Sequence, residues 1–221
     1  MYDSEIKLDF NDIFLQRNEV LNSQFNMKIK FYKTLTRSTL EDIDRLATLL
    51  QDIGETDWAV LGSAVGLLHY KLGCLFVAYK GSEKVAYGFF SYGIECPQFR
   101  RLYYFAVETK FRGVGVGKKS ILEAINREVD LTFGCAVTCN LSLQAYYENL
   151  GFKFLCSMKD KRIKQVDLLL SGRSIDSIRQ EERVTHVIEV NSDFLYLDVP
   201  NIEKEFGLKL LQGDVNTSKI G

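Results

Sequence analysis

The stretch from residue 104 to residue 119 constrains the fold more than any other part of the 221-residue chain. It opens with the apolar and aromatic run Tyr104-Phe105-Ala106-Val107, which predicts a buried strand. Three glycines then occur within five residues, and an amphipathic segment from 120 to 129 predicts a helix. A strand, a glycine-rich turn and a helix start therefore follow one another directly.

Such a junction is suited to binding an anion. The first N–H groups of a helix have no partner within the helix, and the helix dipole favours negative charge there. Glycines let the backbone approach a phosphate closely, and Arg112, Lys118 and Lys119 add positive charge around the turn. We therefore expect a phosphate-bearing ligand on this turn.

Two common nucleotide-binding motifs do not match the turn. The Rossmann fingerprint requires G-x-G-x-x-G in a βαβ unit, whereas Gly113, Gly115 and Gly117 follow a G-x-G-x-G spacing after a predicted hairpin. The P-loop requires a Ser or Thr directly after its lysine, and here Lys119 follows Lys118. Neither nucleotide-binding fold fits.

Composition predicts an ordinary globular protein. The chain is 46% hydrophobic and 26% charged, and its net charge of -1 argues against broad electrostatic binding of nucleic acid. Its five cysteines form no Cys-x-x-Cys pair and it has two histidines, so we expect no metal site, no His-based triad and a reducing compartment. Because we find no signal-peptide pattern and no charge-free stretch long enough for a membrane span, we expect a cytoplasmic protein.

The hydrophobic periodicity predicts one mixed α/β domain at residues 27–171. Residues 1–26 are expected to be an N-terminal extension. Residues 172–221 are expected to be a C-terminal extension that packs on the domain or at a homodimer interface. A medium-sized domain with two extensions accounts for the length of the chain.

Turn and capping signals predict the elements within this domain. A strand is expected at 27–35, and the helix after it is expected to have Ser38 as its N-cap, with Glu41 as the capping-box partner. Asn140 is expected to cap a helix at 141–150, and Gly151 to end it. The remaining strands are expected in two hairpins, 74–92 and 152–170, and at 101–107 and 131–139.

Two motifs together resemble the GNAT superfamily of N-acetyltransferases. Residues 112–117, Arg-Gly-Val-Gly-Val-Gly, resemble the family's [Arg/Gln]-x-x-Gly-x-[Gly/Ala] loop. The segment 140–152 resembles a second family motif, in which Tyr147 lies seven residues after Asn140 and Gly151-Phe152 follows. The resemblance covers roughly residues 27–171 and implies a mixed, mostly antiparallel central sheet flanked by helices.

The resemblance also implies a site for acetyl-CoA or another acyl-CoA, with no metal. Backbone groups of a bulged strand would hold the pantetheine arm as an added strand would, and the glycine turn would hold the pyrophosphate. Tyr147 would be the general acid that protonates the leaving thiolate, and the N–H of Val107 would stabilise the oxyanion. The residues expected to hold the coenzyme are Phe105, Ala106, Val107, Arg112, Gly113, Val114, Gly115, Val116, Gly117, Lys118 and Asn140.

The general base is the part of the resemblance that this sequence does not carry. Many relatives have a glutamate five residues before the coenzyme asparagine, where this chain has Cys135. Others have an acid early in the bulged strand, where this chain has Arg101 and Leu102. The nearest acidic candidates are Glu95 and Glu108, and a base is dispensable if the amine arrives neutral.

The resemblance implies an enzyme that transfers an acetyl group from acetyl-CoA to an amine by direct attack through a tetrahedral intermediate. Two alternatives stay open. One is a non-catalytic acyl-CoA-binding regulatory or interaction module on the same fold, which the missing acid at position 135 favours. The other is an acyltransferase that uses a longer acyl donor. The acceptor is not identified, and residues of its site are expected among Glu55, Asp57 and Trp58.

Overall fold

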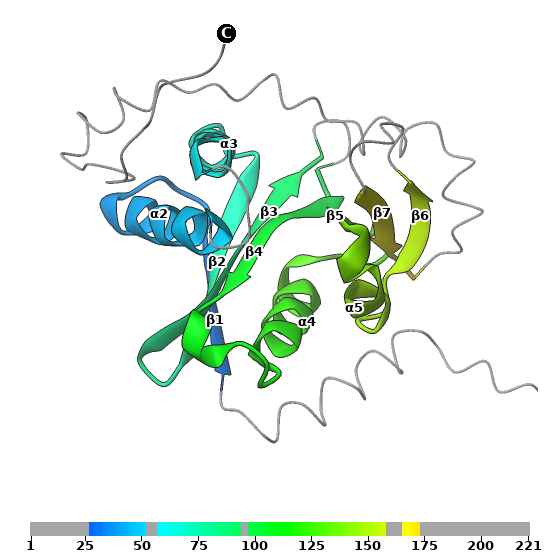
Figure 1. Ribbon diagram of the computed structural model, residues 1–221. Helices are drawn as coiled ribbons and strands as arrows, with labels where there is room; N and C mark the ends of the chain where they lie inside the picture. Colours follow the sequence, from blue (N-terminus) through cyan, green and yellow to red (C-terminus); the bar gives the residue numbers. More distant parts are fainter. Residues whose placement is uncertain (1–26, 52–56, 94–96, 158–164, 173–221) are drawn as a thin grey trace, which may run out of the picture.

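The computed structural model describes residues 27–51, 57–93, 97–157 and 165–172 (Figure 1). The expected extensions lie outside these ranges except for Gly172, and so do Glu55 and Glu95. The strands are β1 (Met27–Tyr32), β2 (Gly73–Lys80), β3 (Glu83–Tyr92), β4 (Arg100–Val107), β5 (Cys135–Asn140), β6 (Lys153–Ser157) and β7 (Gln165–Leu170). The α-helices are α2 (Arg37–Gln51), α3 (Asp57–His69), α4 (Val116–Glu128) and α5 (Gln144–Glu148), and two 3-10 turns are η1 (Thr109–Phe111) and η2 (Leu141–Leu143).

All seven of these strands belong to one sheet in the order β1-β2-β3-β4-β5-β7-β6. Neighbouring strands are antiparallel except β4 and β5, which are parallel. The expected mixed, mostly antiparallel sheet is therefore confirmed, and both expected hairpins are present. In Figure 1 β1–β4 and β5–β7 form two halves of the sheet that meet where β4 and β5 begin.

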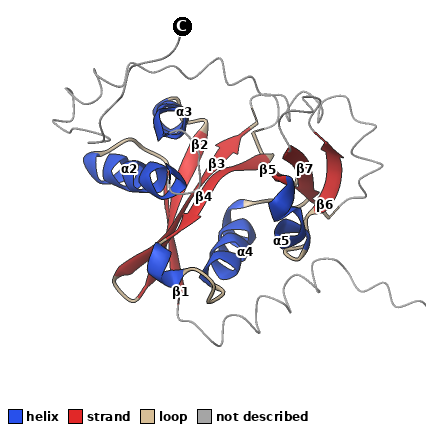
Figure 2. Cartoon of the chain, in the orientation of Figure 1, coloured by secondary structure: helices blue, strands red, loops and turns tan. Residues whose placement is uncertain are grey.

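Helices cover both faces of the sheet (Figure 2). One hydrophobic core lies under α2 and α3 and includes Leu46, Leu61 and Phe89. The other core lies under α4 and α5 and includes Phe76 and Ile121. Apolar residues follow helical spacing in α2, so one stripe of that helix is buried against the sheet: Leu40, Ile43, Leu46, Ala47 and Leu50.

The start of α2 differs from the sequence prediction. The helix begins at Arg37, and its cap is a reciprocal pair of threonines instead of Ser38 with Glu41. The N–H of Thr39 donates to the Thr36 hydroxyl at 3.2 Å, and the N–H of Thr36 donates to the Thr39 hydroxyl at 2.8 Å. Threonine at the third position satisfies the same orphan N–H that a glutamate would, so the cap is shifted by two residues.

Two searches of the described residues gave no site and no span. No helix among them is both long and apolar enough to cross a membrane. In the same residues, no three His, Cys, Asp or Glu side chains are grouped so that they could hold a metal ion.

Gly88 on β3 allows Phe76 to pack across the sheet, and we expect this contact to be sensitive to one added methyl group. Gly88 pairs with Phe76, and a Cβ at Gly88 would overlap the fully buried Phe76 ring. Gly88→Ala should lower the free energy of unfolding by about 1–3 kcal/mol, as overpacking of a core does. Urea denaturation measures this change. The control is Gly172→Ala, where the nearest atom to the added Cβ is 3.7 Å away. Equal effects of the two substitutions would contradict the account.

Candidate active site

The two central parallel strands, β4 and β5, form a fork. They pair over only three residues each, 100–102 with 135–137, although both strands continue beyond that point. From Tyr103 to Val107 the described part of β5 offers β4 no partner. A strand edge that faces the inside of a sheet without a partner is a ready place for an extended ligand to add as a strand.

A bulge at Tyr103 begins the separation. Phe89 of β3 pairs with Tyr104 and Phe90 with Leu102, so Tyr103 is the extra residue. The resemblance led us to expect a bulged strand, and the bulge lies two residues before Phe105. Its consequence is that Tyr103 and Tyr104 pack on the same face of the sheet, under α2 and α3, with ring centroids 4.7 Å apart.

The backbone groups of Phe105 and Val107 point into the fork. The N–H of Glu108 donates to Val85 of β3 at 3.0 Å, and N–H directions alternate along a strand. The N–H groups of Phe105 and Val107 therefore point away from β3, toward the side of β5. Two residues apart on one edge, they have the spacing that a strand-like ligand arm requires.

The glycine turn lies at the open end of the fork. After η1 the chain passes through Gly113 at φ 78° and Gly115 at φ 84°, a left-handed conformation that disfavours a side chain. Gly115 is the N-cap of α4 and provides no side-chain cap, so the first N–H groups of the helix are not satisfied by a cap. The helix begins at Val116, four residues before the predicted start, and Gly117 and Lys118 belong to its first turn.

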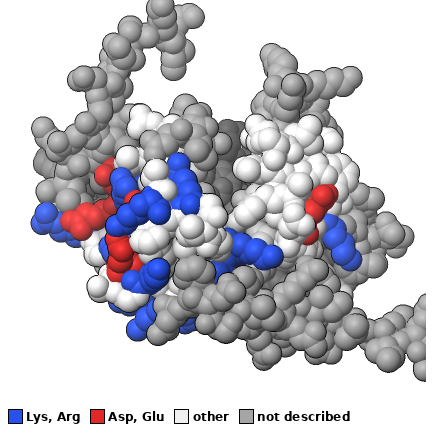
Figure 3. Space-filling model, turned by 60° about the horizontal axis from the view of Figure 1, so that its bottom comes forward, with Lys and Arg blue, Asp and Glu red and all other residues white. Residues whose placement is uncertain are grey.

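The basic side chains around the turn differ in what they contact. Arg112 donates from its Nε to the carbonyl of Val107 at 3.0 Å, which ties the turn to the end of β4. Lys110 forms an ion pair with Glu83. Figure 3, which brings this end of the molecule forward, shows Lys and Arg side chains over the surface with Asp and Glu among them. The helix start is therefore the uncapped positive feature of the turn, and Arg112 shapes the turn.

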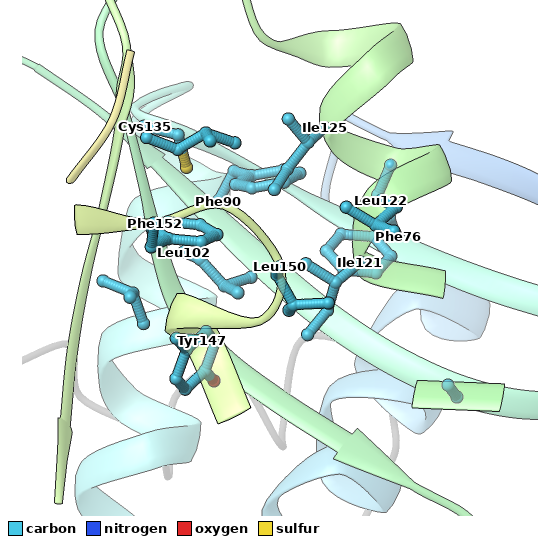
Figure 4. Close-up of a cluster of buried hydrophobic side chains, with 14 of the residues drawn as sticks. Phe76, Phe90, Leu102, Ile121, Leu122, Ile125, Cys135, Tyr147, Leu150 and Phe152 are labelled. Carbon is cyan, nitrogen blue, oxygen red and sulfur yellow. The ribbon is translucent and has the colours of Figure 1, made fainter. Parts of the chain in front are cut away.

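Helix α5 places two adjacent tyrosines differently. Tyr147 is 8% exposed and packs edge-to-face on Phe152 with ring centroids 5.7 Å apart. Figure 4 shows Tyr147 at the edge of the buried cluster, with its oxygen pointing away from the other labelled side chains. Burial raises the pKa of Tyr147 above its usual value, so the phenol is protonated at neutral pH and can donate a proton.

The Gly151-Phe152 pair ends α5 as predicted. Gly151 has φ 100°, and the N–H of Phe152 donates to the carbonyl of Tyr147 at 3.2 Å while that of Gly151 donates to Glu148 at 2.9 Å. These are the two bonds of a Schellman motif, whose hydrophobic contact is here Tyr147 with Phe152. The spacing of the second motif thus has a structural reason that holds without any ligand.

Tyr146 reaches the first turn of α4, which our sequence analysis did not foresee. Its hydroxyl lies 3.2 Å from the position that a Cβ on Gly117 would take, and Val107 Cγ2 lies 3.2 Å from the same position. The missing side chain of Gly117 therefore lets α4, α5 and β4 converge at one point. Burial raises the pKa of Tyr146 to about 12, so this phenol is also a proton donor at neutral pH. Only the contact across the fork, which sequence spacing does not show, distinguishes it from Tyr147.

Asn140 ends β5 and caps η2 as predicted. Its side-chain oxygen accepts from the N–H of Ser142 at 3.1 Å and from the Ser142 hydroxyl at 3.2 Å. The helix predicted to follow is divided into η2 and α5. The cap uses the side-chain oxygen of Asn140, whereas a coenzyme carbonyl would accept from its amide nitrogen.

The acidic candidates for a general base do not converge on the fork. Glu95 and the side chains of Asp57 and Trp58 lie outside the description. Glu108 is held by Arg45 of α2, with Nε–Oε1 at 2.9 Å and Nη2–Oε2 at 2.6 Å. The Arg45 hydrogen bonds lower the pKa of Glu108, which makes it a weaker base. Its role as a base stays a prediction, and its placement favours a structural ion pair.

Cys135 does not replace the missing glutamate. The thiol is fully buried beside the first pair of the fork, and burial raises its pKa to about 12. A neutral buried thiol is neither a base nor a nucleophile. Core packing accounts for this cysteine.

The comparison with protein families agrees with this geometry. The sequence model of the acetyltransferase (GNAT) family matches residues 42–152, about half of the chain. The chain therefore belongs to the GNAT acetyltransferase family, whose members use acetyl-CoA.

Solved structures show the same fold at low sequence identity. An acetyltransferase from Thermus thermophilus matches with a TM-score of 0.50 at 15% identity, over 64% of this chain and 96% of its own. A candidate N-acetyltransferase from Lactobacillus plantarum gives 0.53 at 15%, over 65% and 95%. A candidate GNAT acetyltransferase from Desulfovibrio desulfuricans gives 0.52 at 14%, over 66% and 100%. A comparison with curated proteins gives no match.

Gly115 and Gly81 form a matched pair for testing the turn. Both have positive φ and open space for a Cβ, but Gly81 lies in the β2–β3 turn. Gly115→Ala and Gly81→Ala should each lose about 1 kcal/mol of stability because alanine resists this conformation. Only Gly115→Ala should weaken binding of coenzyme A, by about tenfold, because it redirects the N–H groups at the start of α4. Titration calorimetry measures the affinities. Equal affinity in the two variants would show that the turn does not hold the phosphates.

Proposed function

We propose that this chain is an acyl-CoA-dependent N-acetyltransferase that moves an acetyl group from acetyl-CoA to an amine. The observation that supports this best is the alignment of two binding features along β4. The strand offers inward-pointing backbone groups at Phe105 and Val107, and the chain then leads directly into the uncapped start of α4. A ligand that carries amides at one end and phosphates at the other matches both features in order.

The donor would bind along the edge of β4. In this proposal the amides of the pantetheine arm pair with the backbone of Phe105 and Val107, and Asn140 contacts the arm from β5. The pyrophosphate accepts from the N–H groups of the turn between Arg112 and Lys118. The thioester then lies where β4 and β5 separate, between the two halves of the sheet.

The chemistry is a direct transfer. The amine nitrogen attacks the thioester carbonyl and a C–N bond forms, while the carbonyl oxygen becomes an oxyanion that the N–H of Val107 stabilises. The tetrahedral intermediate collapses with loss of the C–S bond. The thiolate takes a proton from the Tyr147 phenol, and the amine loses its proton to solvent water. A neutral amine needs no dedicated base, which agrees with the ion-paired state of Glu108.

Acetyl-CoA should bind this protein and stabilise it. Ligand at 100 times its Kd should raise the unfolding free energy by about 2.7 kcal/mol, which a thermal melt detects as a higher Tm. Desulfo-coenzyme A should bind comparably, because the contacts on the turn and on β4 do not require sulfur. Absence of binding at millimolar acetyl-CoA would contradict the proposal.

Tyr147→Phe tests the general acid. Loss of the phenol should lower kcat with a good amine acceptor about 100-fold, while the Kd for acetyl-CoA stays within about twofold. Tyr146→Phe is the matched control, because it removes the adjacent hydroxyl and should cost much less. The assay is release of free thiol from acetyl-CoA. A large loss in Tyr146→Phe with a small loss in Tyr147→Phe would transfer the acid role to the residue beside Gly117.

Two observations favour the alternative of a binding module. Position 135 carries a buried thiol in place of an acid, and Glu108 is committed to Arg45. Acetyl-CoA binding without acetylation of any amine in a broad panel would support this alternative, and one acetylated product would exclude it. A donor with a longer acyl chain is distinguished by comparing acyl-CoA chain lengths in the same assay.

A further inference from the structure

Three polar side chains from three strands form one hydrogen-bonded chain at the apex of the fork. Arg101 of β4 donates from Nη1 to the Thr138 hydroxyl of β5 at 2.6 Å. Thr138 donates in turn to Oδ1 of Asp167 on β7 at 2.5 Å. We call these residues the Arg101–Thr138–Asp167 array. The function proposed above assigns none of them a role.

The register of the sheet puts the array on the face opposite α4. Thr138 pairs with Asp167, Arg101 pairs with Ala136, and paired residues share a face. Leu102 and Val137, the last pair before the strands separate, belong to the core under α4. Arg101 and Thr138 are their neighbours in sequence, so their side chains lie on the other face, where α2 and α3 pack. Thr138 is also the first β5 residue past the paired segment, so the array spans the apex of the fork.

Burial orders the array. Asp167 is 3% exposed, whereas Arg101 is partly exposed. A buried carboxylate is stable only with donors and a counter-charge, and Thr138 and the guanidinium supply both. The donors run in one direction, from guanidinium to hydroxyl to carboxylate. The positive end of the array is therefore its more exposed end.

The acceptor must approach the thioester from this same face. On the other face the apex is closed by packed side chains of α4, α5 and the strands, including Leu102, Ile121 and Leu150 (Figure 4). The donor enters along β4 from the start of α4. An amine that attacks a thioester in the fork therefore arrives beside the guanidinium of Arg101.

We propose that Arg101, positioned by Thr138 and Asp167, binds a carboxylate that the acceptor carries close to its amino group. This inference rests on the proposed acetyltransferase function. A guanidinium presents paired N–H donors that match the two oxygens of a carboxylate. Paired strands lie about 4.8 Å apart, so a group at the apex is within about one strand spacing of the reacting carbonyl. Only a carboxylate one or two bonds from the amine-bearing carbon can satisfy both contacts, which points to a small amino acid as the acceptor.

The test compares acids with their amides. The twenty common amino acids and their α-carboxamides are assayed as acceptors with acetyl-CoA, and each is also titrated into the protein saturated with coenzyme A. At least one amino acid should exceed its carboxamide in kcat/KM and in affinity by about 10- to 100-fold, the range expected for a charged hydrogen-bonded contact. Arg101→Gln should reduce this acid-to-amide ratio to near one, and Arg101→Lys should restore part of it.

Three further variants separate recognition from folding. Thr138→Val and Asp167→Asn should each lower the acid-to-amide ratio severalfold, because they release the guanidinium from its position. Arg100→Gln removes the same charge from the adjacent residue, whose Nη2 lies 3.7 Å from Glu128 of α4 on the other face, and should leave the ratio unchanged. A ratio of two acceptors cancels a loss of folded protein, and the Tm shift with acetyl-CoA reports folding for each variant.

The outcomes that overturn the inference differ from those that overturn the proposed function. A wild-type ratio near one in turnover and in binding, a preference for the amides, or a ratio unaffected by Arg101→Gln overturns carboxylate recognition while acetyl transfer stands. Failure to bind acetyl-CoA overturns the function. If acetyl-CoA binds without turnover, the calorimetric ratio alone decides the inference.

Discussion

The separation of β4 from β5 after three paired residues is the constraint on which the rest of the site depends. Inside a sheet every strand edge is expected to be paired, and a buried backbone group left without a partner costs about 1–3 kcal/mol. The bulge at Tyr103 turns the strand at the point where the separation begins, and the core under α4 and α5 fills the space on one side. A ligand with its own amides can satisfy the edge that the fork leaves open. The fork is therefore a reason for the fold to bind an extended molecule, independent of its resemblance to any family.

The sequence predicted the parts of this structure that are local in the chain. The strand, the glycine turn and the helix start adjoin one another, so their chemistry could be inferred from spacing alone. The same holds for Gly151, because a left-handed residue after a short helix favours glycine. The cap of α2 was misplaced because threonine at position 39 does the work that the pattern assigns to glutamate. Both signals use a side-chain oxygen, and sequence does not show which hydroxyl points at which N–H.

The features that sequence could not show are contacts across the sheet. Arg101, Thr138 and Asp167 come together only through the register of three strands, which periodicity does not fix. The proximity of Tyr146 to Gly117 depends on the packing of α5 against α4. The same holds for Glu108, whose ion pair with Arg45 of α2 joins residues that are far apart in the sequence. The donor side of the site is thus local and readable, whereas the acceptor side is assembled from distant segments.

Hydrogen–deuterium exchange of the amides with and without acetyl-CoA tests the central claim most directly. If the fork and the start of α4 hold the coenzyme, the amides of Phe105 and Val107 and those of residues 115–117 should exchange more slowly when it is bound. Amides of β1 and the β2–β3 turn, which lie away from the fork, should change little. Slower exchange confined to other segments, with no change along β4, would contradict the account.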